Sequence, residues 1–494
     1  MNKPTVACSL FLGLALTLLA GCGGSSFSPN PVPVQPPAPL SSSNLNLIFV
    51  ASEDLAYQAS GDINPKTANL TNQGLQRSLQ MATFLQQNVL GKQNVTEIYA
   101  LEPMTHLQTE HNYPDMVGLE TIQQFALLNQ VTLSSDPYGG SPYAGQSYPI
   151  NASYADATLP VGVVPPSQFC PNCQGLDFHD QNGNNESLLT GILKANVPGF
   201  YVFSAPWETV SALMINFNQR LGYPLTLPSS YISPNVIYAI AITPSGSASL
   251  ATYNSNLNPP STYPVLSPPL ASAECNAQTH FNITVIGGQG GAVIPAGINT
   301  NETLYIIRHA DAHPRLYWDD NNYVGAGQWR ALDLPNALLG KVVNVEQVYS
   351  NDPAQFGPGS VSAAGESTWS SVAPPLTAVP YAIANNLPYN LVTSFDLSDP
   401  LVAQKTSAFF FSGGQFTNQT VLLAWSFQFI QPTIAALLTS YNAGQKAPPS
   451  GVWPPTDYDT IWTVKLDAVG NLTVNNGMCE GIKSPAPTSP PPQF

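Results

Sequence analysis

Arginine and histidine stand side by side at positions 308 and 309, directly after a short apolar run. The run at residues 304–307 reads LYII, and four consecutive apolar residues predict a buried strand of a parallel sheet. In an open α/β sheet, ligands bind in the crevice beyond the carboxyl ends of the strands, so Arg308 and His309 should lie at its lip. A planar guanidinium suits the bidentate geometry of a phosphate group. The pair therefore predicts a cationic lip that suits an anionic ligand.

Further candidate groups follow within a few residues. Arg315 is the best-placed second anchor for an anion, and His313 could donate a proton or help to hold the anion. His309 and His313 have the i, i+4 spacing that suits a metal on a helix, but Pro314 and the preceding strand argue against a helix. No third ligand is evident, so neither a metal nor another cofactor is predicted. The acid that would protonate a leaving group stays open among Asp311, Asp319, Asp320 and Asp352.

The elements that must position these residues occur twice along the chain. When Gly74 is set against Gly327, Arg77 falls on Arg330. The segments that match are residues 44–54 and 304–312, 69–86 and 322–340, 95–103 and 345–353, 199–217 and 420–438, and 235–254 and 458–476. Matching elements in the same order predict a duplicated α/β domain.

The predicted fold class is α/β, with two tandem domains, each a mainly parallel sheet flanked by helices. Residues 47–50 and 304–307 are predicted to be equivalent central strands. The predicted segments are a lipoprotein signal peptide (1–21), a Gly/Ser/Pro-rich tether (22–44), an N-terminal domain (45–258), a linker (259–273), a C-terminal domain (274–482) and a Pro-rich tail (483–494). Below, residues 45–258 are called the first half and residues 274–482 the second half.

A strand that runs straight into Arg-His resembles the signature of the histidine phosphatase (phosphoglycerate mutase-like) superfamily. LTNQGLQRSLQMATFL, at residues 70–85, looks like the first helix of that family. The resemblance covers nearly all of residues 45–482. It implies two histidine-phosphatase-like domains, with His309 as the nucleophile that forms a phosphohistidine and Arg308 as a ligand of the phosphate oxygens. A histidine-dependent phosphomonoesterase acting on a phosphorylated or anionic small molecule is the activity implied.

Both halves depart from the family pattern. The first half carries Ala51-Ser52 in place of Arg-His, and Ala205 stands where the family places its second histidine. In the second half, spacing puts Phe427 at the second-histidine position and Ala373 or a neighbour at the second-arginine position. Neither position can be filled, because the last arginine of the chain is Arg330 and its last histidine precedes Arg330.

These losses bear directly on the predicted function. Each missing donor to a developing phosphorane charge costs about 10²–10³ in rate. Weak or absent phosphomonoesterase activity is therefore predicted. The alternative is a non-catalytic envelope protein that binds an anionic or sugar-like ligand or a protein partner. Arg330 matches Arg77 of the first half, so a salt-bridge or helix-surface role is expected for it.

The N-terminus resembles a bacterial lipoprotein signal. Lys3 precedes the apolar run SLFLGLALTLLA, and Leu19-Ala20-Gly21-Cys22 would present Cys22 for acylation. An ordinary secretory signal is the alternative. The Pro-rich tether after Cys22 would hold the folded part off a membrane surface. The predicted location is the bacterial cell envelope, lipid-anchored on the periplasmic side of a membrane or at the cell surface.

The remaining cysteines suit an oxidising compartment. Cys170 and Cys173 could form a redox or zinc pair, but a local disulfide is favoured because no second close pair is present. Cys275 and Cys479 bracket the second half and are predicted to pair.

Composition narrows the partners further. Charged residues make up 9% of the chain and the net charge is −15, so its surface should repel nucleic acid, and no nucleic-acid partner is predicted. His106 and His111 are expected to be solvated and to flank a Thr/Gln-rich helix. His309 could instead be a core-edge residue bonded to a carbonyl, and the aromatic residues 317–323 could line a sugar site or pack as a loop. The oligomeric state is left open.

Overall fold

The main sheet of the first half is built around a fully buried strand. This computed structural model describes residues 37–57, 61–128, 150–151, 175–180, 183–266, 280–312, 321–354, 370–392, 397, 399–448, 453–454 and 457–483. Within them, the first sheet has the strand order β5-β2-β6-β1-β7-β8. Its strands are β1 (Leu45–Ser52), β2 (Glu97–Ala100), β5 (Ile150–Asn151), β6 (Gly199–Pro206), β7 (Val236–Ile242) and β8 (Ala248–Asn254). β1 pairs parallel with β6 and antiparallel with β7.

The second half repeats this arrangement. Its sheet has the order β12-β11-β13-β10-β14-β15-β9 in the described residues. The strands are β9 (Asn282–Val285), β10 (Glu302–Arg308), β11 (Gln347–Asn351), β12 (Tyr389–Val392), β13 (Thr420–Trp425), β14 (Thr460–Leu466) and β15 (Leu472–Cys479). β10 pairs parallel with β13 and antiparallel with β14, as β1 does with β6 and β7. The protein is therefore mixed α/β, and each sheet joins a parallel block to an antiparallel edge.

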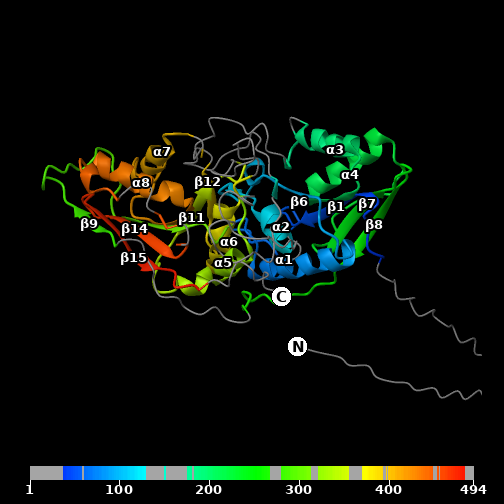
Figure 1. Ribbon diagram of the computed structural model, residues 1–494, viewed down its shortest axis with the longest axis horizontal. Coiled ribbons are helices and arrows are strands. Elements are labelled where there is room, and N and C mark those ends of the chain that lie inside the picture. The colour runs from blue at the N-terminus through cyan, green and yellow to red at the C-terminus, as the bar shows by residue number, and fades with distance from the viewer. Residues whose placement is uncertain are drawn as a thin grey trace, which may run out of the picture. The chain divides into compact units, whose positions relative to one another are not determined.

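Helices follow the strands in the same order in both halves. The first half has α1 (Asn72–Phe84), α2 (Val117–Leu128), α3 (Asn184–Ala195) and α4 (Trp207–Leu221), and the second has α5 (Gly325–Ala337), α6 (Ala373–Asn385), α7 (Val402–Phe411) and α8 (Phe427–Ser440). Figure 1 shows α3 and α4 beside the first sheet and α7 and α8 beside the second. In the described part of the chain, no helix has both the length and the apolar character that crossing a membrane requires.

Both central strands are buried on their two faces. Successive side chains of a strand point to opposite sides, and Ile48 and Val50 enter one apolar cluster while Leu47 and Phe49 enter another. In β10, Tyr305 and Ile307 enter the cluster that holds Ile48 and Val50, whereas Leu304 and Ile306 enter a third. One apolar cluster is thus shared by the two halves, and the apolar runs form fully buried strands as predicted.

A glycine in the first turn of α1, and its equivalent in α5, lets each helix approach the loop that follows the central strand. A Cβ on Gly74 would lie 2.4 Å from the carbonyl oxygen of Asp62, and a Cβ on Gly327 would lie 2.4 Å from that of Asp311. The next turn of each helix carries an arginine that pairs with the same aspartate: Arg77 Nε lies 2.5 Å from Asp62 Oδ2, and Arg330 Nε 2.8 Å from Asp311 Oδ2. The sequence alignment of the two glycines therefore corresponds to a shared local structure.

Polar contacts join the halves where the shared apolar cluster ends. Gln123 Nε2 donates to Asn322 Oδ1 at 2.7 Å. Glu102 and Asp352 occupy matching positions of the repeat, and their carboxyl groups lie close enough for each to shift the pKa of the other. Both are essentially inaccessible to solvent. Burial, followed by the neighbouring Asp352, raises the pKa of Glu102 well above its usual value. Two ionised carboxylates buried side by side would be costly, so we expect the pair to keep a proton at neutral pH.

The segment between His106 and His111 differs from the expectation. It contains no helix but a hairpin of β3 (Leu107–Gln108) and β4 (Tyr113–Pro114). His111 is exposed, as predicted. The prediction for His106 was wrong, because its side chain is only 14% exposed and lies between Asp54 and Asp115.

Candidate functional site

Arg308 ends β10, and its side chain turns into the protein. The residue is 3% exposed. Its Nη1 donates to the carbonyl oxygen of Asp457 at 3.0 Å. The guanidinium carbon lies 3.8 Å from the ring centre of Tyr458 and 4.3 Å from that of Phe427. Burial lowers the pKa of Arg308, and cation–π contact with the two rings partly replaces the hydration lost there.

His309 follows at the edge of the sheet and is half-buried. Its Nδ1 lies 2.9 Å from the carbonyl oxygen of Ala310. A carbonyl oxygen only accepts, so Nδ1 carries the hydrogen and the lone pair is on Nε2. Burial and the adjacent Arg308 charge lower the pKa of His309 to about 3. The imidazole is therefore neutral at physiological pH, in the tautomer that leaves Nε2 able to act as a nucleophile or to accept a hydrogen bond.

Aromatic side chains surround this pair. The His309 ring centre lies 6.2 Å from that of Phe427 and 6.0 Å from that of Tyr458. Phe427, which spacing matches to the second histidine of the family, is the first residue of α8 and does lie beside Arg308 and His309. In the strand register, Trp425 is the residue opposite Arg308.

Asp457, Tyr458 and Thr377 were missed by the sequence reasoning. Asp457 and Tyr458 precede β14, which runs antiparallel to β10, so the start of β14 meets the carboxyl end of β10. Thr377 on α6 accepts a hydrogen bond from the Ala310 backbone N–H at 2.8 Å through Oγ1. The TDYDT run ahead of a predicted hairpin was the available signal for the first two residues.

The other predicted site residues divide into two groups. Arg330 forms the expected salt bridges, with Asp311 at 2.8 Å, Glu480 at 2.5 Å and Asp459 at 3.4 Å. Of the candidate acids, Asp311 is therefore engaged by Arg330, and Asp352 is engaged by Glu102. Outside the described residues lie His313, Arg315, Asp319, Asp320, most of the aromatic segment 317–323, Cys22, Cys170, Cys173 and Cys275.

Cys479, the last residue of β15, takes part in a disulfide bond. This is the bonding state predicted for it. Because Cys275 is outside the described residues, its pairing with Cys479 stays a prediction.

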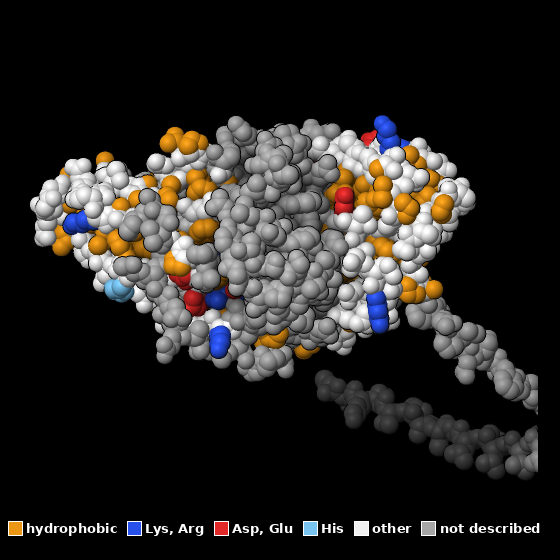
Figure 2. Space-filling view, viewed as in Figure 1, with side chains coloured by type: hydrophobic (Ala, Val, Ile, Leu, Met, Phe, Trp, Pro, Cys, Tyr) orange, Lys and Arg blue, Asp and Glu red, His pale blue; other side chains and the backbone are white. Residues whose placement is uncertain are grey.

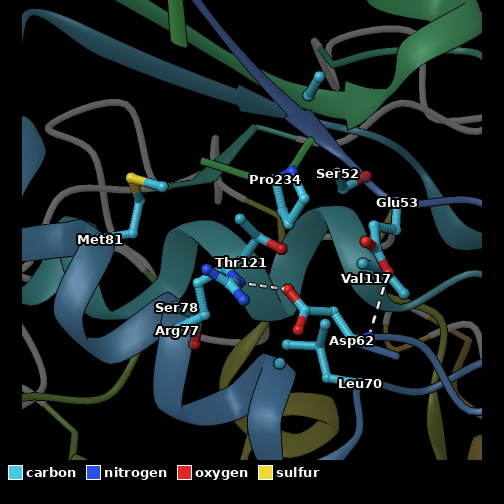
Figure 3. A pocket seen from close by; sticks show the side chains of 12 residues that line it. Ser52, Glu53, Asp62, Leu70, Arg77, Ser78, Met81, Val117, Thr121 and Pro234 are labelled. Atoms are coloured by element: carbon cyan, nitrogen blue, oxygen red, sulfur yellow. Dashed lines mark hydrogen bonds and ion pairs between the residues drawn. The ribbon is translucent and has the colours of Figure 1, made fainter. Parts of the chain in front are cut away.

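In the first half, the end of β1 borders a small cavity (Figure 3). The cavity has a volume of about 20 Å³, and its lining includes Ser52, Glu53, Asp62 and Arg77. Ser52 Oγ, Glu53 Oε1 and Asp62 Oδ1 have no hydrogen-bond partner among the described residues. Burial, followed by the charge of Asp62, raises the pKa of Glu53 to about 7. This volume suits one water molecule, which would donate to two of these oxygens and accept from the hydroxyl.

No protein-family model matches this sequence, and a search of curated proteins finds no significant match.

Proposed function

We propose that the protein is a histidine-phosphatase-like protein with a degenerate site, in which Arg308 and His309 persist without efficient phosphoryl transfer. The two domains of this proposal are the two halves, each with its own sheet. Support comes from the repeated strand order and from Arg-His at the carboxyl end of the central strand of the second half.

The position of the Arg308 guanidinium carries the proposal. A phosphate anchor presents its N–H groups to the ligand, but Arg308 donates to the Asp457 carbonyl and lies over the rings of Tyr458 and Phe427. If the resemblance holds, the ring of Phe427 takes the place of a second cationic donor. Phosphoryl transfer depends mainly on positioning and charge stabilisation, so this arrangement disfavours turnover.

His309 fits either a former nucleophile or a binding residue. Its neutral state and Nδ1–H bond leave Nε2 as a hydrogen-bond acceptor, which suits a ligand hydroxyl or N–H group. The neighbouring Phe427 and Tyr458 rings would favour a ligand with a flat or sugar-like face. Binding without turnover, of an anionic or sugar-like ligand, is the second function proposed for this edge.

The setting proposed for this function is the bacterial cell envelope, with a lipid anchor on Cys22. This location is proposed from the N-terminal sequence, in which an apolar run leads into Leu19-Ala20-Gly21-Cys22. On the face drawn in Figure 2, the described basic side chains stand singly or beside acidic ones. The described part of this face therefore offers no cluster of basic side chains that would hold an anionic membrane or a nucleic acid.

Turnover of a generic phosphomonoester by the full chain tests the proposal. We expect the wild-type protein to hydrolyse it no faster than His309→Ala, with the exposed His111→Ala as a matched control. Turnover of 1 s⁻¹ or more, on the order of ordinary enzyme rates, abolished by His309→Ala but not by His111→Ala, would overturn it. Vanadate titration of the same proteins separates the alternatives. Binding lost in Arg308→Ala, without turnover, supports the degenerate phosphate site, whereas no binding favours a neutral ligand.

A further inference from the structure

The carboxyl edge of the first sheet carries a second cluster of chemical groups, away from Arg308 and His309. Asp54 lies two residues beyond β1, and His106 and Asp115 lie in the connection between β2 and α2. One ligand atom from each of the three residues lies within 4.8 Å of the other two. Ligands of α/β sheets bind at this edge. The first half, which lacks Arg-His, thus presents a different set of ligands at the corresponding place.

Asp115 fixes the orientation of the His106 ring. Its Oδ2 lies 2.8 Å from Nδ1 of His106, while its Oδ1 accepts from the Val117 backbone N–H at 3.0 Å. Asp115 is completely buried. The ring of Phe178 stacks on the imidazole with centres 3.6 Å apart and an angle of 8°. The ring is therefore held from its edge and from one face, and its Nε2 has one defined direction.

That direction leads to Asp54, but without forming a hydrogen bond. His106 Nε2 lies 3.3 Å from Asp54 Oδ2. Nevertheless, Asp54 Oδ2 is buried with no hydrogen-bond partner among the described residues, and Asp54 as a whole is 5% exposed. The nitrogen and the oxygen are close together but not aligned as donor and acceptor. This geometry is expected of a nitrogen and an oxygen that both bind an ion lying between them.

The spacing matches two ligands of one metal ion. Zinc binds nitrogen and carboxylate oxygen at about 2.0–2.2 Å, so two ligands of a tetrahedral ion are separated by roughly 3.4 Å. An Nδ1–H···carboxylate bond on the opposite side of the ring is the usual support of a metal-bound histidine. Glu208, in the first turn of α4, is exposed, and its charge acts on both Asp54 and His106, so we consider it as a third ligand.

We propose that Asp54 Oδ2 and His106 Nε2 bind a divalent transition-metal ion of the zinc class, with Asp115 orienting the histidine and Glu208 completing the protein ligands. Charge supports this assignment. The ion neutralises two buried carboxylates, Asp54 and Asp115, with the imidazole uncharged, whereas a protonated imidazole leaves one negative charge uncompensated. The inference is independent of the proposed function of Arg308 and His309.

A proton is the competing occupant of the same place. Burial alone would lower the pKa of His106, but the hydrogen bond and charge of Asp115, followed by the charges of Asp54 and Glu208, outweigh burial and raise it. An imidazolium bridging two aspartates would need no metal. Direct measurement of metal binding separates the two occupants.

The experiment uses the full chain, without a polyhistidine tag and stripped of metal, titrated with Zn²⁺ against a chromophoric chelator. We expect the wild-type chain to bind one Zn²⁺. This binding should be lost in Asp54→Asn and in His106→Gln, and should be about 10–100-fold weaker in Asp115→Asn. His111→Gln, on the same hairpin, is the matched control and should bind as wild type does. Co²⁺ in place of Zn²⁺ should give an absorption spectrum of a four- or five-coordinate ion in the wild type and in His111→Gln, but not in Asp54→Asn.

Two results would overturn the proposal. One is a wild-type chain that binds no Zn²⁺, which leaves the imidazolium as the occupant. The other is stoichiometric binding that persists in Asp54→Asn. This variant decides the outcome even where His106→Gln fails to fold, because an asparagine keeps the shape of Asp54 and its bond from the Ala56 N–H. Circular dichroism checks that each variant is folded.

Discussion

Replacing Gly327 by alanine should destabilise the protein by about 1–2 kcal/mol. A Cβ at this position would lie 2.4 Å from the carbonyl oxygen of Asp311 and 2.6 Å from Cβ of Tyr323. Neither atom is the far end of a flexible side chain, so helix α5 or the loop must shift by several tenths of an ångström. Overpacking of this kind costs about 1–3 kcal/mol, and the better helix propensity of alanine returns at most about 1 kcal/mol.

Gly191 supplies the matched control. It lies inside helix α3, is exposed, and an added Cβ would meet no atom within 4 Å. Gly191→Ala should therefore stabilise the protein by about 0.5–1 kcal/mol. If Gly→Ala lowers the stability at position 327 but raises it at position 191, the loss at 327 comes from the contact with the Asp311 loop and not from the helix.

The repeat extends the prediction to Gly74. An alanine there would meet the Asp62 carbonyl oxygen at 2.4 Å, but its second contact, at 2.8 Å, is the terminal Cδ2 of Leu70. A terminal methyl group moves more easily than a Cβ, so Gly74→Ala should cost less than Gly327→Ala. Urea unfolding followed by circular dichroism measures all three variants. A Gly327→Ala protein as stable as Gly191→Ala would refute the close approach.

Two further predictions concern buried charges. Arg330→Met should destabilise by about 3–5 kcal/mol in the same urea assay, because it leaves Asp311 and Glu480 without their cation; a loss below 1 kcal/mol would contradict the buried pairing. Burial raises the pKa of Glu302 to about 8, so the folded state binds its proton more tightly than the unfolded state does. Its contribution to stability is therefore lost as pH rises from about 4.5 to 8, and Glu302→Gln should flatten the decline between pH 5 and 8. An unchanged pH profile would rule this out.

Much of the architecture could be predicted because it depends on the types and spacing of residues that are close together in the sequence. The apolar runs before Ser52 and His309 specify strands buried on both faces, and the repeated spacing of glycine and arginine fixed the equivalence of α1 and α5. These signals depend on neighbouring residues only. They were sufficient to predict the central strands β1 and β10, the helices α1 and α5, and that Arg308 and His309 lie at the end of a central strand.

The surroundings of the site depend on contacts that local pattern does not carry. The residues next to Tyr458 in the sequence do not indicate that its ring covers Arg308. This contact follows from the antiparallel pairing of β14 with β10. The β3–β4 hairpin escaped prediction for another reason. Its turn uses left-handed conformations at Thr109 and Asn112, and it lacks the Gly or Asn-Gly signal that usually marks such turns.

The buried pair of Glu102 and Asp352 makes the contact between the two halves depend on the pH of the solution. Together the buried pair keeps a proton that two exposed carboxyl groups would give up at neutral pH. Any event that separates these side chains, including unfolding, must therefore release that proton. Calorimetric unfolding in buffers of different ionisation enthalpy would register it, and Glu102→Gln, which can hold the contact without the proton, would not release it. The association of the two halves thereby acquires a dependence on pH that neither half would have by itself.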